Sequence, residues 1–199
     1  MPKIEFFFDY GSPYSYLANA VIAGIAEQHG AELRYRPMLL GGVFKATGNQ
    51  SPMMETVTAK RSYGGAALSR TAALHGLSIV TNPNFPINTL GLMRLAVAAQ
   101  REGVFDAFHG NAYTGFWQQG LDLGDVQVQA ELIRDAGLDP EKLLARAAED
   151  DVKAELRANT DEAVARGAFG APTFFIEDQM FFGVDHLPYL IRNLEEHTR

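Results

Sequence analysis

The chain has 199 residues, 47% of them apolar and 11% aromatic, so it is long enough to bury one substantial core. Its 24 acidic and 17 basic side chains give a formal net charge of −7, which argues against nucleic acid as the main partner, because phosphate binding needs clustered lysine and arginine. No cysteine is present, which excludes disulfide bonds, thiolate metal sites and thiol chemistry by the protein itself. Any sulfur chemistry must use a sulfur that a ligand supplies.

The start of the chain runs from Met1 straight into a strand pattern, without the apolar core or cleavage site of a secretion signal. No uninterrupted apolar run reaches the length of a membrane span. We therefore expect a soluble, cytoplasmic protein with no membrane partner.

The first elements are predicted to be strand, helix and strand. The aromatic-rich residues 3–9 predict a buried strand, and residues 14–28 repeat apolar side chains at four-residue steps, which predicts a helix. Residues 31–38 alternate apolar with charged side chains and predict a second strand parallel to the first. The glycine-rich residues 39–49 are expected to be irregular.

The middle of the chain predicts roughly five helices. They cover Ala66–His75, Asn88–Gln100, Val104–Trp117, Val126–Ala136 and Pro140–Arg166. Asp125 and Asp139 mark helix starts, while Gly76 and Gly137 mark helix ends. Large apolar side chains of this region are expected in the core: Met93, Phe105, Phe108 and Trp117.

The last part of the chain returns to strand patterns. Residues 173–176 and 180–182 predict a hairpin that turns through residues 177–179, and Asp185 is expected to start a final helix. No internal repeat, low-complexity segment or polar linker is present, so the helical block is predicted to be an insertion within one domain.

The most informative junction is Gly11-Ser12-Pro13, between the first strand and the first helix. Serine is a favoured N-cap, and Pro13 suits the first helical position. The free N–H groups and the dipole of a helix start can hold an anion, and a charged sulfur would suit such a site. The local pattern also fits a Ser12 that only caps the helix.

The element order, with Pro-Thr just before the third strand, is similar to the thioredoxin fold with a helical insertion, as in the disulfide oxidoreductase DsbA. This resemblance implies an α/β, thioredoxin-like fold (βαβ, helices, ββα) in a single unit of residues 1–199. About residues 1–50 and 168–199 would form the thioredoxin part and about 51–167 the helical insertion. The Cys-x-x-Cys pair of such proteins corresponds here to Ser12-Pro13-Tyr14-Ser15, so thiol–disulfide exchange cannot run.

Six motifs along nearly the whole chain resemble the 2-hydroxychromene-2-carboxylate isomerases and the kappa-class glutathione transferases, which share this fold and use a bound glutathione. The motifs are FDYGSPYS (8–15), FKATGN (44–49), AK (59–60) ahead of Tyr63, FPINTL (85–90), GAFGAPT (167–173) and FGVDHL (182–187). No one motif is decisive, but six in the same order favour a functional Ser12.

The resemblance implies that Ser12, with Pro13 and Tyr14 at the helix start, holds the glutathione sulfur. The Ser12 hydroxyl would donate a hydrogen bond to the thiolate, and the helix N-terminus would lower the thiol pKa. Ala171, before a Pro172 that the families have in cis, would offer its backbone to the cysteinyl part of the tripeptide.

The resemblance also implies contacts for the ends of glutathione. Backbone groups at Gly183, Val184 and Asp185 would hold the γ-glutamyl carboxylate, and the Asp185 side chain would pair with the ammonium. A plain helix cap is the alternative role for Asp185. Asn49 would hydrogen-bond the tripeptide from the loop after the second strand. Lys60 would meet the glycyl carboxylate, unless it is simply a solvated lysine.

Other residues are implied in substrate binding. In the isomerases a lysine at the position of Lys45 contacts the substrate carboxylate, although a solvated loop lysine fits the sequence equally well. Asn49 and Gln50 follow on the same segment. Asn84 and Phe85 are candidates for the opposite wall, where the aromatic ring would stack on a planar substrate.

The function implied is a glutathione-dependent isomerase of aromatic (naphthalene) catabolism, which interconverts 2-hydroxychromene-2-carboxylate and trans-O-hydroxybenzylidenepyruvate. Its partner would be a small aromatic carboxylic acid, and the protein would be a homodimer. One alternative is a kappa-like transferase that conjugates glutathione to an electrophile. Another is a non-catalytic thioredoxin-like binding module. The five histidines show no metal-ligand spacing, so no metal site is expected.

Overall fold

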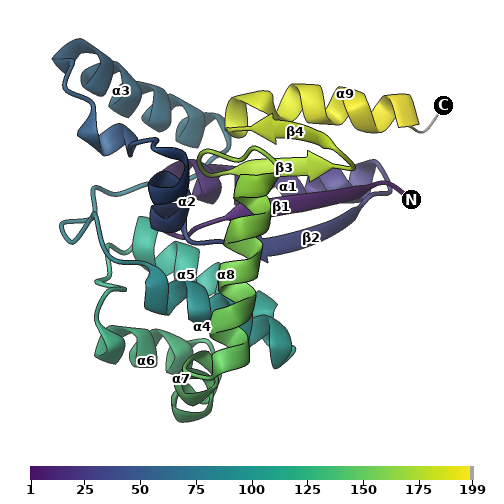
Figure 1. The fold of residues 1–199 in the computed structure, drawn as a ribbon. Helices are drawn as coiled ribbons and strands as arrows, with labels where there is room; N and C mark the ends of the chain where they lie inside the picture. The colour runs from purple at the N-terminus through teal and green to yellow at the C-terminus, as the bar shows by residue number, and fades with distance from the viewer. Residues whose placement is uncertain (198–199) are drawn as a thin grey trace.

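The computed structural model describes residues 1–197, and its strands form a four-stranded sheet in the order β2-β1-β3-β4 (Figure 1). Strands β1 (Lys3–Phe8) and β2 (Glu32–Pro37) run parallel, as a strand–helix–strand crossover requires. Strand β3 (Thr173–Ile176) pairs antiparallel with both β1 and β4 (Gln179–Phe182). This mixed sheet confirms the predicted thioredoxin-like α/β fold, with the expected hairpin at one edge.

Helix α1 (Pro13–Gln28) joins the two parallel strands. In Figure 1, α8 crosses in front of the sheet, α1 lies behind it, and α3 extends away from the body of the molecule. The other described helices are α2 (Leu40–Thr47), α3 (Thr58–Leu74), α4 (Leu90–Arg101), α5 (Phe105–Trp117), α6 (Val126–Asp135), α7 (Pro140–Ala147), α8 (Asp150–Ala165) and α9 (Leu187–His197), with short 3-10 turns at Pro52–Met54 (η1) and Val184–His186 (η2).

The three phenylalanines of β1 divide between two cores because successive side chains of a strand point to opposite faces. Phe6 and Phe8 enter the larger core, where Phe6 stacks on Phe174 of β3 with ring centroids 4.9 Å apart. Phe7 enters the smaller core on the α8 side and meets Phe175 edge-on at 5.6 Å. A continuous apolar strand therefore marks a sheet that is covered on both faces.

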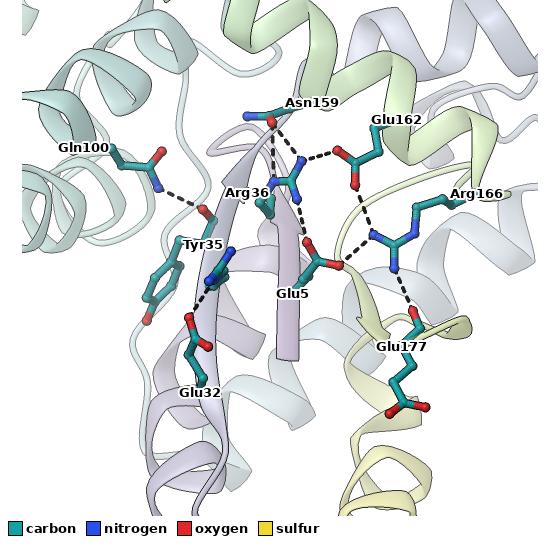
Figure 2. Close-up of polar contacts among 10 residues, drawn as sticks. Glu5, Glu32, Tyr35, Arg36, Gln100, Asn159, Glu162, Arg166 and Glu177 are labelled. Atoms are coloured by element: carbon teal, nitrogen blue, oxygen red, sulfur yellow. Dashed lines mark hydrogen bonds and ion pairs between the residues drawn. The ribbon is translucent and has the colours of Figure 1, made fainter. Parts of the chain in front are cut away.

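An ion-pair cluster ties the sheet to α8 (Figure 2). The Glu5 carboxylate accepts hydrogen bonds from Arg36 at 2.5 Å and from Arg166 at 2.7 Å, and both arginines also pair with Glu162. Arg166 further donates to the carbonyl oxygen of Glu177 at 2.8 Å, in the turn between β3 and β4. One cluster thus connects β1, β2, α8 and the hairpin.

Most of the predicted boundaries agree with the structure. Asp125 and Asp139 cap α6 and α7 through hydrogen bonds to backbone N–H groups, as predicted. Gly76 and Gly137 adopt φ values of 65° and 74° just beyond α3 and α6, where a residue without a side chain relieves the strain of the left-handed conformation. The large apolar residues of this region lie in or against the core: Met93, Phe105, Phe108 and Trp117.

Helix α2 corrects the prediction that residues 39–49 are irregular. Two adjacent glycines made this segment look like a loop. In the structure α2 packs closely against α8. Gly42 permits this approach, because a Cβ at its position would lie only 3.1 Å from Thr160 Cγ2. Tertiary packing here overrides a weak helix propensity.

Three further boundaries differ from the predictions. The expected helix at 140–166 is divided into α7 and α8, with an extended Glu149 between them and acidic residues in the first turn of α8. Helix α3 begins at Thr58 rather than Ala66, although it contains Gly64 and Gly65, which have low helix propensity. The segment at Asp185 is the 3-10 turn η2, and α9 follows it.

Candidate active site

Ser12 lies at the N-cap of α1, as predicted. Its Oγ accepts a hydrogen bond from the N–H of Ser15 at 3.1 Å and donates one to the carbonyl oxygen of Ala171 at 2.9 Å. Ser12 is 3% exposed, so a ligand can meet only a small part of it. The hydroxyl therefore joins the start of α1 to the loop before β3, and its role toward a sulfur atom stays a prediction.

One backbone N–H in the first turn of α1 has no hydrogen-bond acceptor in residues 1–197. Pro13 has no N–H, and the Ser15 N–H is taken by Ser12. The Tyr14 N–H has no acceptor among residues 1–197. Burial raises the pKa of the half-buried Tyr14 phenol, and the negative charge of Asp185 raises it further. Tyr14 and Asp185 thus lie near each other at the N-terminal end of α1.

The Ala171-Pro172 peptide bond is cis, as the family resemblance implied, and both residues are buried. The carbonyl oxygen of Pro172 accepts a hydrogen bond from the Gly183 N–H at 2.9 Å. Gly183 has a φ of 87°, a left-handed conformation that favours glycine. This hydrogen bond fixes the turn before η2 beside the loop that Ser12 contacts.

Turn η2 holds two backbone N–H groups and one carboxylate that have no partner in residues 1–197. Val184 is buried and Asp185 is exposed. Within the described part of the chain, neither the N–H groups of these two residues nor the Asp185 carboxylate has a hydrogen-bond partner. Asp185 is therefore not the plain helix cap of the alternative interpretation. Two donors and one carboxylate are available to a ligand.

Asn49 bonds to the loop before β3, whereas Lys60 lies on α3. The Asn49 amide donates to the carbonyl oxygen of Phe169 at 2.8 Å and its oxygen accepts from the Gln50 N–H, so it connects the loop after α2 to the loop before β3. Lys60 is exposed on α3 and pairs with Glu55 at 3.7 Å. No contact among the described residues brings Lys60 to Ser12, and both binding roles stay predictions.

Lys45 lies in the last turn of α2, where a positive charge suits the helix dipole. Its side chain is exposed and pairs with no carboxylate in residues 1–197. Gln50 is exposed on the loop that follows. Both positions are accessible to a substrate, and their predicted contacts stay predictions.

Phe85 is half-buried against the core rather than projecting from a loop. Its ring packs on Trp117, with centroids 5.3 Å apart, and the Trp117 Nε1 donates to the carbonyl oxygen of Tyr10 at 2.8 Å. Asn84 is exposed and its backbone N–H is held by Asn82. This chain of contacts connects the segment of Asn84 and Phe85 to the segment that leads into Ser12.

Asp9 is the site residue that sequence reasoning missed. It is fully buried at the end of β1 and accepts hydrogen bonds from three separate segments. The available signal was an acidic side chain directly after three phenylalanines, where burial is expected.

His109 is a core residue. Burial lowers its pKa to about 3, and its ring lies between the Tyr10 hydroxyl at 2.9 Å and the Asn19 side-chain oxygen at 2.7 Å. Among residues 1–197, no three histidine or acidic side chains are grouped so that they can hold a metal ion. In the same residues, no helix is long and apolar enough to cross a membrane.

Comparison with known proteins places the chain in a family. A model of the DSBA-like thioredoxin domain matches residues 3–195, and the chain belongs to this family. Its relatives include a 2-hydroxychromene-2-carboxylate isomerase from Sphingobium xenophagum, 32% identical over 94% of this chain and 95% of the relative. Glutathione S-transferase kappa 1 of Caenorhabditis elegans is 28% identical over 98% of this chain and 91% of the relative.

A solved structure of a 2-hydroxychromene-2-carboxylate isomerase is similar throughout. It superposes with a TM-score of 0.83 at 26% identity, covering 99% of this chain and 96% of that chain. The family resemblance inferred from the six motifs is thereby confirmed, for both the isomerases and the kappa-class transferases.

Proposed function

We propose that this protein is a glutathione-dependent isomerase that interconverts 2-hydroxychromene-2-carboxylate and trans-O-hydroxybenzylidenepyruvate. The observation that carries the proposal is the hydrogen bond from Ser12 to the carbonyl of Ala171, beside polar groups that have no partner in residues 1–197. The similarity of the whole chain to proteins named 2-hydroxychromene-2-carboxylate isomerase supports it.

The site residues fit a zwitterionic peptide thiol. The N–H groups of Val184 and Asp185 can receive a carboxylate, and the unpaired Asp185 carboxylate can receive an ammonium group. The carbonyl of Ala171 can accept a hydrogen bond from a peptide N–H. The Tyr14 N–H lies at the start of α1, where the helix dipole favours a negative charge.

When bound, glutathione would supply a thiolate that adds reversibly to the conjugated carbon of the acid, so that a double bond becomes a rotatable single bond. In the described structure the Ser12 hydroxyl donates its hydrogen bond to the Ala171 carbonyl oxygen. To bind the sulfur, the Ser12 hydroxyl would rotate away from the Ala171 carbonyl, and a peptide N–H of the ligand would leave that carbonyl with a hydrogen-bond donor. Ser12 would then stabilise a negative charge without acting as a nucleophile.

Lys45 is the cation proposed for the substrate carboxylate, because it is exposed at the end of α2 and has no carboxylate partner in residues 1–197. Asn84 and Phe85 would line the opposite wall. Phe85 is held in place by Trp117, so its ring position does not depend on the substrate.

The test is an absorbance assay of the chromene acid with and without glutathione, followed by mass analysis of the products. Isomerisation that needs glutathione and leaves it unconsumed supports the proposal. A stable thioether would identify a kappa-like transferase instead. No binding of glutathione in calorimetric titration would identify a non-catalytic thioredoxin-like module.

A further inference from the structure

Asp9 connects three segments that surround Ser12. Its Oδ1 accepts a hydrogen bond from the Gly11 N–H at 2.8 Å, in the turn that leads into Ser12. Its Oδ2 accepts from the Leu40 N–H at 2.8 Å, at the first residue of α2, and from the Thr89 hydroxyl at 3.0 Å, at the N-cap of α4. Both carboxylate oxygens are therefore used.

Packing alone does not account for a carboxylate at this position. Asp9 is 0% exposed, and burial raises its pKa while the hydrogen bonds from Leu40, Gly11 and Thr89 oppose that change. No cation pairs with it in residues 1–197. Taking a carboxylate out of water is costly unless its oxygens are well hydrogen-bonded, so its three contacts are what hold it there.

The N-terminus of helix α2 depends on hydrogen bonds to side chains of other elements. Its N-cap residue, Leu39, makes no side-chain cap, and Val43 is the fully buried residue of the helix. The first backbone N–H groups are instead received by other elements: Thr160 of α8 takes that of Leu39 at 2.9 Å, and Asp9 takes that of Leu40. Asp9, which follows strand β1, thus takes the place of a helix cap for α2.

The segments joined by Asp9 carry the two walls of the proposed site. The last turn of α2 carries Lys45, and the segment with Asn84 and Phe85 leads into the Thr89 end of α4. The turn at Gly11 leads into Ser12. We propose that Asp9 is a positioning residue that sets α2 and the start of α4 relative to Ser12, and so fixes the substrate-binding wall relative to the sulfur site. Its effect on the reaction rests on the proposed function.

The first test is independent of activity. Asp9→Ala removes all three acceptors, and we expect amide hydrogen exchange of residues 40–47 to accelerate about tenfold or more relative to α8. Thr89→Val is the matched control, since it removes one hydroxyl donor and leaves both backbone hydrogen bonds of Asp9. It should leave the exchange of residues 40–47 as in the wild type. Equal acceleration in every element of Asp9→Ala would overturn the proposal.

A second variant covers the case in which Asp9→Ala fails to fold. Asp9→Asn keeps the volume but puts an NH2 donor in place of one of the two acceptor oxygens. Because the N–H groups of Gly11 and Leu40 bind different oxygens of Asp9, one of them then faces a donor. We expect local acceleration of exchange in the Gly11 turn or at the start of α2. A folded Asp9→Asn protein with wild-type exchange in both segments contradicts the positioning role.

The third test measures coupling to substrate binding. If Asp9 acts by placing α2, Lys45→Met should raise the KM for the chromene acid about tenfold in the wild type but less than about twofold in an Asp9 variant. Additive effects of the two changes overturn the proposal. A wild-type protein without isomerase activity refutes the proposed function instead, and the exchange result for Asp9 remains valid.

Discussion

The Ser12 hydroxyl donates a hydrogen bond of 2.9 Å to the carbonyl oxygen of Ala171, across a separation of 159 residues. This contact joins the start of α1 to the loop of the cis proline. Because the hydroxyl also caps α1, the same oxygen serves local stability and the proposed chemistry.

Replacing Ser12 by alanine should therefore lower both stability and activity. Loss of the cap should cost about 1 kcal/mol of the free energy of unfolding. Loss of a hydrogen bond to a thiolate should cost about 1.5–3 kcal/mol, hence about a 10- to 100-fold fall in rate at neutral pH. Steady-state kinetics, thermal melts and the ultraviolet absorbance of the thiolate measure these effects.

Asp125→Ala is the matched control for the cap, because Asp125 caps α6 through the Gln127 N–H at 2.7 Å. It should reduce stability by a similar amount and leave the rate unchanged. Full activity and an unaltered thiolate signal in Ser12→Ala would show that Ser12 is only a cap.

Replacing Asp185 by alanine should weaken glutathione binding about tenfold or more, because a carboxylate that pairs with the γ-glutamyl ammonium is lost. Stability should change little, since Asp185 is exposed and its side chain has no partner in residues 1–197. Asp178→Ala removes an exposed carboxylate from the β3–β4 turn and should leave affinity intact. Calorimetric titration distinguishes a binding role from a general charge effect, which both variants would share.

Replacing Glu5 by glutamine should make stability less dependent on pH in acid. Burial raises the Glu5 pKa, but the hydrogen bonds and charges of Arg166 and Arg36 hold it below its ordinary value of 4.5. A carboxyl group with a lowered folded pKa contributes stability that is present above the unfolded pKa and is lost as the pH falls through the folded pKa. The wild type should thus exceed Glu5→Gln in stability at neutral pH, and the difference should shrink as the pH falls below 4.5.

Denaturant unfolding across this pH range measures the difference. Glu32→Gln is the control, because Glu32 pairs with Arg34 on the exposed edge of the same sheet. An equal pH dependence in the two variants would mean that the Glu5 cluster is no more than a surface ion pair.

The sequence predicted the parts of the site that depend on local pattern. The strand-to-helix junction at Ser12, its cap and the hairpin of β3 and β4 all follow from residues close in the chain. Helix α2 and the contacts of Asp9 did not follow, because Leu40 and Thr89 are brought to Asp9 by packing over separations of 31 and 80 residues. Such contacts leave no periodic signal in a single sequence.

Replacing Lys45 by methionine separates the isomerase from the transferase. The change keeps the length of the side chain and removes its charge, so the chromene acid should lose apparent affinity and turnover while an uncharged electrophile reacts nearly as before. Glutathione affinity should be unchanged in both assays. Equal loss for both substrates would show that Lys45 supports α2 or the glutathione site. No loss for either substrate would show that Lys45 is a solvated lysine, which its exposed position near the end of α2 also permits. The carboxylate of the substrate would then need another partner.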